Sequence, residues 1–559
     1  MQQRWGLPIV AWPSRLRPNF WDLVALPIVL GTIILIAWAS QQMNAPYHAG
    51  EVLPISLDPR RLPAYGLRTV LRMALALAAS LGFSLAYAAL AAKSRRAEKL
   101  LIPVLDILQS VPILGFLSIT VTGFIAIFPG KLLGYECAAI FAIFTSQAWN
   151  MTFSLYQSFI GVPQDLREAA RMYHLSPWQS FWQLEVPYAL PSLVWNMMMS
   201  VSGGWFFVVA SEAISVSGHT VLLPGIGSYI AMAIDQRDLA AVGYAILAML
   251  VFILVYDQLL FRPLLAWGQR FKVEAIGQDE IEPPWFLVML QRARLFDLLR
   301  AVVDALAGLV SRARRAVRRR PRALPIKLPP PRWIDLGWNV ILAFGTFAAL
   351  VDIALFVRSE VDPQEVLHVC ALGFVTLIRV VVLIALAALV WVPVGVWIGF
   401  RPRLARRVQP VVQFLAAFPA NLFFPVVVSA IVKLHLDVEV WVSPLMILGT
   451  QWYILFNVIA GTLALPTDYQ FVASNLGVTR WLWWRRLVLP GIFPAFVTGA
   501  VTASGGSWNA SIVAEVVRWG DTTLVATGIG AYIAQETEKG DFPRIALGIT
   551  VLSLYVLLF

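Results

Sequence analysis

Few side chains in this sequence have the type and spacing needed for covalent or metal chemistry. Its five histidines are scattered without the spacing of metal ligands, and they are His48, His174, His219, His368 and His435. We interpret Cys137 and Cys370, which lie far apart in or beside apolar segments, as small core residues, a disulfide or metal pair being the alternative. The phosphate-binding sequence Gly-x-x-x-x-Gly-Lys does not occur. We therefore expect no catalytic residue, no metal site and no cofactor in this chain.

One polar loop, residues 163–187, carries a pattern suited to binding another protein. Pro163 with Asp165 is typical of a helix start, and Glu168 followed by two alanines gives that helix a compact face of polar and small residues. The helix is expected to end near His174, ahead of a Ser-Pro pair. A short helix lying parallel to a membrane can fit a groove in a partner; the alternative is a plain solvated loop.

The loop recurs because the chain is a tandem duplication. At an offset of 303 residues the matching pairs are Pro163 and Pro466, Asp165 and Asp468, Pro187 and Pro490, Gly203 and Gly506, Trp205 and Trp508, Glu212 and Glu515, Gly225 and Gly528, and Tyr229 and Tyr532. Upstream the offset drifts to 307, as for Pro112 and Pro419. Two parallel halves around an axis along the membrane normal can enclose one central pathway, as in transporters built from repeats.

Composition indicates that the elements carrying these residues lie in a membrane. The 559 residues are 59% hydrophobic and 13% charged, with a mean hydropathy of +0.73. These values exclude soluble globular domains, a disordered chain, a disulfide-rich scaffold and a coiled coil. Residues 262–332 hold 15 Lys and Arg against 6 Asp and Glu, which is most of the net charge of +11. We interpret this stretch as a juxtamembrane basic segment and expect no nucleic-acid partner.

The apolar runs predict an all-α integral membrane protein with twelve transmembrane helices, arranged as two parallel six-helix repeats. We place the helices near residues 22–40, 68–92, 101–127, 134–157, 188–214 and 239–261, and then near 335–357, 369–399, 408–433, 438–462, 490–517 and 541–559. The expected division is a first repeat over 1–261, a basic cytoplasmic linker over 262–333 and a second repeat over 334–559.

Positive charge sets the expected orientation, because short cytoplasmic loops are enriched in Lys and Arg. Basic residues precede the first helix and fill the loops near Lys93 and Arg401, so we predict a cytoplasmic N-terminus. Ala37-Trp38-Ala39 could be a signal-peptidase site, but we favour an uncleaved anchor.

Residues 291–320 of the linker are predicted either as an amphipathic helix on the anionic lipid surface or as a disordered basic tether. Since the chain stops inside its last helix, we expect a further cytoplasmic tail.

The loop at 163–187 resembles the EAA loop of bacterial ABC importer permeases. That pattern is Glu-Ala-Ala, three residues, Gly, nine residues, and then an apolar residue, any residue, an apolar residue and Pro. Glu168, Ala169, Ala170, Leu184, Val186 and Pro187 fit it, with His174 at the Gly position. The second loop matches with Gly477, Leu487, Leu489 and Pro490, whereas Phe471, Val472 and Ala473 replace Glu-Ala-Ala. Because a left-handed backbone suits Gly better than His, we expect the first loop to turn differently.

The resemblance implies a type I ABC importer-like fold in a bacterial inner membrane. Two ATPase subunits, binding ATP and Mg, would dock on these loops and drive alternating access, and a periplasmic or lipid-anchored binding protein would deliver the substrate. The implied docking residues are Glu168, Ala169, Ala170, His174, Pro187, Val472, Ala473, Gly477 and Pro490. The segments from Ser211 to Gly227 and from Ala514 to Gly530 look like the subgroup that imports nitrate, taurine, sulfonates and related small anions.

Helix geometry suggests where a substrate would pass. At 1.5 Å per residue, a helix that begins near Pro187 reaches the membrane middle around Ser202 to Trp205 and the outer edge around Glu212, so Gly203 and Gly506 mark the midplane. The candidates for the pathway are Gly203, Gly204, Trp205, Gly506, Trp508 and Asn509, with close helix packing as the alternative role of the glycines. Glu212 and Glu515 are predicted to accept hydrogen bonds from the following turns at Gly225 and Gly528, as a structural outer gate.

Two classes of function follow from these observations. The first is the membrane subunit of an ATP-driven importer of a small anion such as nitrate, a sulfonate, taurine or bicarbonate. The alternative is a twelve-helix secondary carrier coupled to an ion gradient, for which Asp106 is the clear candidate coupling group. A membrane-embedded enzyme would need a cluster of acids, histidines or cysteines that the sequence does not have.

Overall fold

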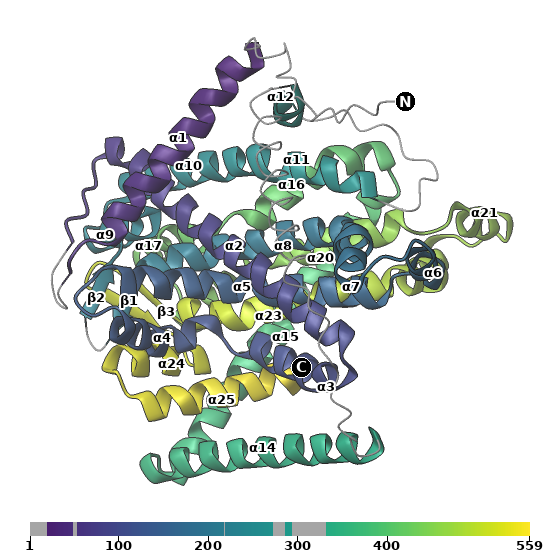
Figure 1. Cartoon of the computed structure of the whole chain (residues 1–559). Helices are drawn as coiled ribbons and strands as arrows, with labels where there is room; N and C mark the ends of the chain where they lie inside the picture. Colours follow the sequence, from purple (N-terminus) through teal and green to yellow (C-terminus); the bar gives the residue numbers. More distant parts are fainter. Residues whose placement is uncertain (1–19, 48–52, 217–218, 272–284, 293–330, 559) are drawn as a thin grey trace.

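Two sets of the same elements follow one another along the chain (Figure 1). The computed structural model describes residues 20–47, 53–216, 219–271, 285–292 and 331–558. The predicted cytoplasmic N-terminus and nearly all of the predicted linker helix at 291–320 fall outside these residues.

The first set consists of α1 (Phe20–Met43), α2 (Leu62–Lys93), α3 (Arg95–Ser110), α4 (Ile113–Ile127), α5 (Leu133–Ile160), α6 (Gln164–Met172), α7 (Pro177–Ser180), α8 (Val186–Glu212), β1 (Ala213–Val216), β2 (His219–Leu222), α9 (Ile226–Asp235), α10 (Leu239–Tyr256) and α11 (Arg262–Gly268). After α12 (Trp285–Arg292) come α14 (Pro331–Glu360), α15 (Pro363–Gly399), α16 (Pro402–Ala417), α17 (Phe424–Leu434), α18 (Val438–Trp441), α19 (Ser443–Ile447), α20 (Gln451–Leu463), α21 (Thr467–Asn475), α22 (Arg480–Trp483), α23 (Leu489–Ala514), β3 (Val516–Trp519), β4 (Thr522–Val525), α24 (Ile529–Lys539) and α25 (Phe542–Leu558).

Each half carries one short antiparallel hairpin directly after its long helix α8 or α23, which corrects the prediction of a purely helical protein. Ala213 pairs with Leu222 in the first hairpin, and Val516 pairs with Val525 in the second. The four-residue strands were too short to give a periodic pattern in the sequence. The chain is therefore mostly helical, with two small hairpins at equivalent positions.

Two helices that were predicted to be continuous are broken at prolines. The predicted helix 101–127 divides into α3 and α4, because Val111 is extended (ψ 126°) ahead of Pro112. Phe418 is likewise extended (ψ 127°) ahead of Pro419, so the predicted helix 408–433 bends by 72°. The continuous helix predicted at 438–462 is also bent, by 43°, whereas its counterpart α5 is unbroken.

The breaks let each half place part of its chain on the other half, namely α4 from the first half and the turn at 418–422 from the second. Leu114 and Leu117 of α4 join the hydrophobic core that is built mainly from the second half, while Phe418 and Leu422 join the core of the first half. A polar contact accompanies each crossing. The Asn509 Oδ1 accepts a hydrogen bond from the backbone N–H of Ile113 (2.9 Å). Asn421 in turn donates to the Phe206 carbonyl (3.1 Å). The halves are thus interlocked rather than merely adjacent.

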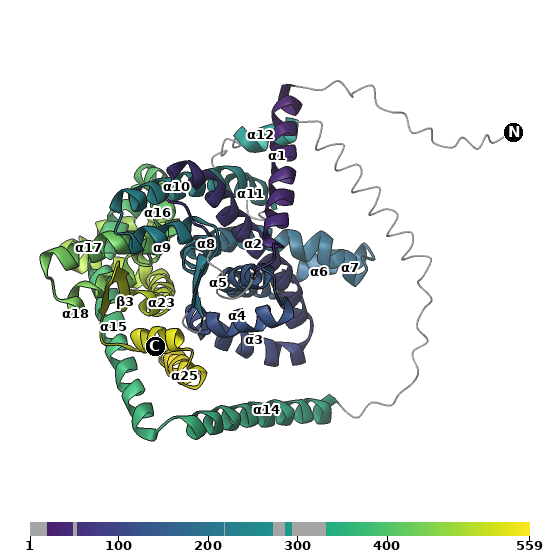
Figure 2. The same ribbon diagram turned by 90° about the vertical axis from the view of Figure 1, so that its left-hand side faces the viewer.

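The first helix of each half lies at the periphery. Both views show α1 and α14 at opposite edges of the molecule (Figures 1 and 2). α1 contacts α2 and α12, and α14 contacts α3 and α25. By contrast, α2, α5 and α8 form the densely packed centre of the first half, and α15, α20 and α23 that of the second.

Five described helical stretches are long and apolar enough to cross a membrane, namely Pro59–Lys93, Pro177–Glu212, Leu239–Gly268, Pro363–Gly399 and Arg480–Ala514. Counting each of two bent helix pairs as one span raises the number to seven. The chain is therefore a multi-pass membrane protein on length and composition, and the total of twelve spans stays a prediction.

We predict that Asn509→Ala weakens the interlocking of the halves. The change leaves the Ile113 N–H at the start of α4 without its acceptor, which costs about 1–3 kcal/mol. Thermal unfolding of the detergent-purified chain measures this loss. Asn457→Ala is the control, because its amide donates within its own helix to the Tyr453 carbonyl. Equal melting temperatures for the two variants would contradict the prediction.

Candidate functional site

The two polar loops form matching projections on one side of the molecule. Figure 1 shows α6 and α21 standing out from the same side. α6 begins directly after Pro163 and α21 directly after Pro466, since proline is compatible with a helix start. Glu168 is exposed at the surface of α6, whereas Ala170 and its equivalent Ala473 are buried against the body of the protein.

His174 and Gly477 end the two helices with the same backbone conformation. Their φ angles are +54° and +64°, both in the left-handed region. The closing hydrogen bonds also correspond: the Leu175 N–H donates to the Ala170 carbonyl (3.0 Å), and the Val478 N–H donates to the Ala473 carbonyl (2.9 Å). The expectation that His174 makes the first loop turn differently is wrong. Histidine tolerates this conformation better than most residues, and the helix-ending hydrogen bonds hold it there.

Large apolar side chains are exposed on both projections. Met172 and Tyr173 are 80% and 81% exposed beside the first turn. Phe471 and Leu476 are 67% and 73% exposed at the second. Side chains of this size rarely gather on a surface that faces only water, so the two projections have the character of protein-binding surfaces.

A π-helical segment joins each projection to the long helix behind it. Phe181–Glu185 precedes α8 and Trp484–Val488 precedes α23, at positions that correspond by the 303-residue offset. Such segments are rare and occur often at functional sites. The first one is also tied to the end of α2, because Lys93 pairs with Glu185 (3.3 Å) and its ammonium lies 4.4 Å from the Phe181 ring centroid. Pro187 and Pro490 lie in the first turns of α8 and α23.

A central cavity of about 570 Å³ lies between the two halves. Gly203 on α8 and Gly506 on α23 both line it, together with Gly505. Most polar groups on its wall are amides and hydroxyls, from Gln109, Ser146, Asn150, Asn196, Ser200, Tyr453, Asn457, Thr498, Thr502 and Ser504, and Trp149 and Trp195 also line it. No charged side chain is among the described residues that line it. The cavity therefore offers neutral hydrogen-bond donors and acceptors to a small polar solute.

The other four pathway candidates lie outside this cavity. The backbone of Gly204 faces Gln147 and Met73, where an added Cβ would come within 2.7 Å of the Gln147 amide nitrogen. Trp205 is buried edge-on against Tyr256, and Trp508 is buried in a stack with Tyr555. Asn509 makes the contact with α4 described above. These residues pack helices together in this conformation, which leaves the two glycines as the candidates that face the cavity.

A buried ion cluster holds the far end of α8. The Arg72 guanidinium donates to Glu136 (2.5 and 2.7 Å) and to Glu212 (2.7 Å), and all three side chains are fully buried. Glu212 also accepts from the Thr69 hydroxyl (2.6 Å) and from the Gly227 N–H (2.6 Å). The Glu212 carboxylate thus connects α8 to α2 and to the start of α9, and the Arg72 guanidinium adds α5 through Glu136.

In both halves the backbone of a glycine lies directly against the carboxylate at the end of the long helix. A Cβ added to Gly225 would lie 2.2 Å from the Glu212 carboxyl carbon, and one added to Gly528 would lie 2.3 Å from that of Glu515. Only glycine leaves room for the carboxylates at these turns. The turns therefore sit directly on the acidic ends of α8 and α23.

The second half repeats the cluster, but its arginine lies farther from the acidic end of the long helix and also binds a partly exposed glutamate. Glu515 accepts from Thr376 (2.8 Å), from the Ala531 N–H (3.0 Å) and from Arg379 (3.3 Å). Arg379 also binds Glu439, whose side chain is 46% exposed. Sequence inspection missed Thr69, Arg72 and Glu136. The signal was present, because Thr376 and Arg379 recur at the 307-residue offset and Glu439 at the 303-residue offset.

One protein family matches both halves of the chain. The family described as "Binding-protein-dependent transport system inner membrane component" matches residues 78–261 and 391–559. The chain is 27% identical to the bicarbonate transport system permease protein CmpB of Synechocystis sp. over 227 residues, which are 40% of this chain and 73% of that protein.

Two further relatives are named for other solutes. The nitrate import permease protein NrtB of Leptolyngbya laminosa is 27% identical over 180 residues, covering 32% of this chain and 61% of the relative. The glycine betaine/carnitine transport permease protein GbuB of Listeria monocytogenes is 26% identical over 171 residues, covering 30% and 54%. The matches to these two relatives span less than two thirds of their length.

We predict that Arg72→Met severely destabilises the first half. The change strands two buried carboxylates, and loss of one partner from a buried ion pair costs about 3–5 kcal/mol. Thermal unfolding in detergent measures the effect. Adding Glu136→Gln and Glu212→Gln to the same chain removes the stranded charges and should recover a large part of the loss.

The matched control for this prediction is Arg518→Met, which removes an arginine that is half exposed and pairs with Glu538. Exposed pairs contribute about 0–1 kcal/mol, so this variant should melt close to the wild type. A melting temperature for Arg72→Met as high as that of the control would refute the role assigned to the cluster.

Proposed function

Because the chain belongs to the family of inner-membrane components of binding-protein-dependent transport systems, we propose that it is the membrane subunit of an ATP-driven importer for a small anion. Family membership makes it a non-catalytic transport subunit and replaces the ion-coupled carrier considered from the sequence. The relatives named for bicarbonate and nitrate support an anionic substrate.

The observation that carries this proposal is the pair of matching projections at α6 and α21. Each ends in the same left-handed turn, exposes large apolar side chains and leads through a π-helical segment into a long helix. Two separate ATPase subunits would bind there, one on each projection, and would supply ATP, Mg and hydrolysis. The docking surface would be built from Glu168, Ala169, His174 and Pro187, and in the second half from Val472, Gly477 and Pro490. Ala170 and Ala473, which are buried, would support it from beneath.

Helix α8 gives a physical route from docking to gating. Its N-terminal end joins the projection, and its C-terminal end carries Glu212, which holds the start of α9. A tilt of α8 imposed by the ATPase would therefore shift Gly203 at the cavity and the turn at Gly225 together. In the second half α23, Gly506, Glu515 and Gly528 would act in the same way. A substrate-binding protein would deliver the solute at the hairpin side of the molecule.

The central cavity suits a small anion held by neutral donors. The amide groups of Asn150, Asn196 and Asn457 and the neighbouring hydroxyls can donate to an oxyanion without fixing a net charge in the wall. Weak, uncharged binding also favours release, because a solute in transit must leave the site as readily as it enters. The choice among nitrate, bicarbonate and sulfonates would then depend on the shape of this wall.

We predict that Gly477→Ala weakens ATPase binding. A non-glycine residue at φ +64° costs about 1 kcal/mol, which lowers the population of the docking-competent turn by roughly fivefold. Co-purification of the genetically adjacent ATPase measures the change. Gly130→Ala is the matched control, with φ +69° and equally open space around the added Cβ, but in the loop between α4 and α5. Equal ATPase yields from the two variants would argue against docking at α21.

We predict that Gly505→Phe blocks transport without preventing assembly. No atom lies within 4 Å of a Cβ added at Gly505, so the phenyl ring can enter the central cavity. Uptake of labelled bicarbonate and nitrate into proteoliposomes should fall at least tenfold while the ATPase still co-purifies. Gly82→Phe, at an equally open and exposed position on α2, should transport normally. Unimpaired uptake by Gly505→Phe would remove the cavity from the pathway.

A further inference from the structure

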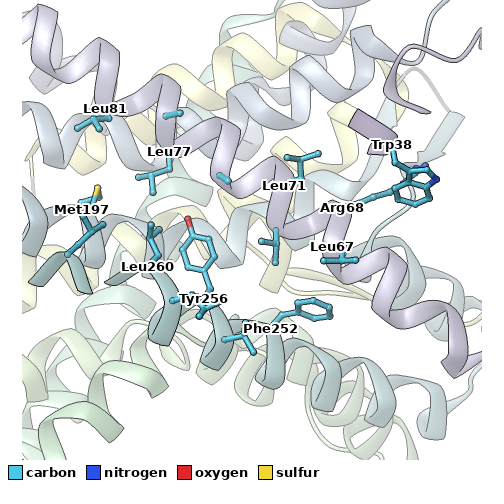
Figure 3. Close-up of a pocket in the computed structure, with 16 residues that line it drawn as sticks. Trp38, Leu67, Arg68, Leu71, Leu77, Leu81, Met197, Phe252, Tyr256 and Leu260 are labelled. Carbon is cyan, nitrogen blue, oxygen red and sulfur yellow. The ribbon is translucent and has the colours of Figure 1, made fainter. Parts of the chain in front are cut away.

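A second large cavity lies on the membrane-facing side of the first half, away from the central axis. It has a volume of about 610 Å³ and is bounded by α2, by α10 with α11, and by the end of α1 (Figure 3). Leucines and other apolar residues form nearly all of its wall. Only about a third of the most apolar stretch of α2, and of α10 with α11, is buried inside the protein, so lipid covers the remainder of these helices. The groove therefore opens toward the hydrocarbon of the bilayer.

Two polar groups stand out in this apolar wall. Arg68 is the one charged residue among the described residues that line it, and its guanidinium lies 5.4 Å from the Trp38 ring centroid. Within the described part of the chain, Arg68 forms no salt bridge with a carboxylate, although Arg72 and Glu136 lie within electrostatic range of it. The Tyr256 hydroxyl is buried and has no hydrogen-bond partner among the described residues, and only 8% of the residue is exposed. Figure 3 shows this hydroxyl pointing into the cavity.

The order of these groups along the groove matches the order of groups in a phospholipid. Arg68 lies at one end with Trp38, Tyr256 lies farther in, and beyond it the wall is purely apolar as far as Leu81 and Met197 (Figure 3). A phosphate, then ester carbonyl acceptors, and then an acyl chain would meet a cation, a hydroxyl donor and hydrocarbon in turn. From Leu67 to Leu81 the wall of α2 is about 21 Å long, enough for the roughly 15 Å of hydrocarbon in one leaflet and part of its interface.

Arg68 also distinguishes this face from its repeat. At the offset that aligns Arg72 with Arg379, the residue equivalent to Arg68 is Val375. The duplicated scaffold therefore does not require a cation here, and the second half offers no equivalent charge at this position. A binding site built on Arg68 would be occupied once per chain.

We propose that this groove binds one glycerophospholipid, with its phosphate on Arg68, an ester carbonyl near the Tyr256 hydroxyl and an acyl chain along α2. A cation that would otherwise be held in an apolar wall gains a charged partner, and an unpaired buried hydroxyl gains an acceptor. The bound lipid would fill the space between α2 and α10 and so brace α2, which carries Arg72, from the membrane side. This inference does not depend on the transported substrate.

Native mass spectrometry of the full chain tests the proposal, with palmitoyl-oleoyl phosphatidylglycerol as the probe. The wild type should retain one lipid at collision energies that strip the remaining lipids. Arg68→Gln, and Ala78→Phe, which fills the groove, should each reduce the retained fraction at least fivefold. Ala79→Phe is the matched control, since it places the same ring on the exposed neighbouring position outside the groove. Arg61→Gln removes a nearby exposed charge and should also have no effect.

Three results would overturn the assignment. Retention that is unchanged in both Arg68→Gln and Ala78→Phe would show that the lipid binds elsewhere. Equal retention of dioleoylglycerol, which lacks the phosphate, would remove Arg68 as the recognition group. A co-purifying membrane protein whose cross-links map to the groove would show that a helix, not a lipid, covers it. All variants are compared only where size-exclusion profiles match the wild type.

Discussion

The contact between Arg72, Glu136 and Glu212 is the constraint on which the first half depends. Three buried charges are stable in a membrane protein only when they satisfy one another, so α2, α5 and α8 must keep one mutual arrangement. The same cluster captures the start of α9 through the Gly227 N–H. The start of α9 is therefore held to the C-terminal end of α8.

The cluster around Arg379 in the second half has equivalent partners, but one of its carboxylates is partly exposed. Arg379 shares its charge between Glu515 and Glu439, and Glu439 is nearly half exposed. Water can reach this corner, so separating the pair there costs less than it does at Arg72. If the proposed alternating-access cycle operates, the C-terminal end of α23 would rearrange more readily than that of α8, although both long helices follow equivalent π-helical segments.

Sequence reasoning recovered the repeat, the long helices and the two projecting loops because each left a pattern of fixed spacing. It failed where the decisive contact joins residues far apart in the chain. Arg72 gave no signal on its own, since its partner Glu136 is 64 residues away and an arginine within an apolar helix is unusual rather than diagnostic. The breaks at Pro112 and Pro419 were visible as prolines, but the crossing of α4 onto the other half was not. Helix rotation, which buried Trp205 and Trp508, cannot be derived from spacing when all faces of a helix are apolar.

The crossing of α4 also bears on how the protein is made. Leu114 and Leu117 find their packing partners in segments that are synthesised hundreds of residues later. Until α23, α24 and α25 enter the membrane, one face of the newly inserted first half has only lipid to contact. Biogenesis of the first half is thus completed by translation of the second, and a fused chain ensures that the correct partner arrives at the same site and in equal amount.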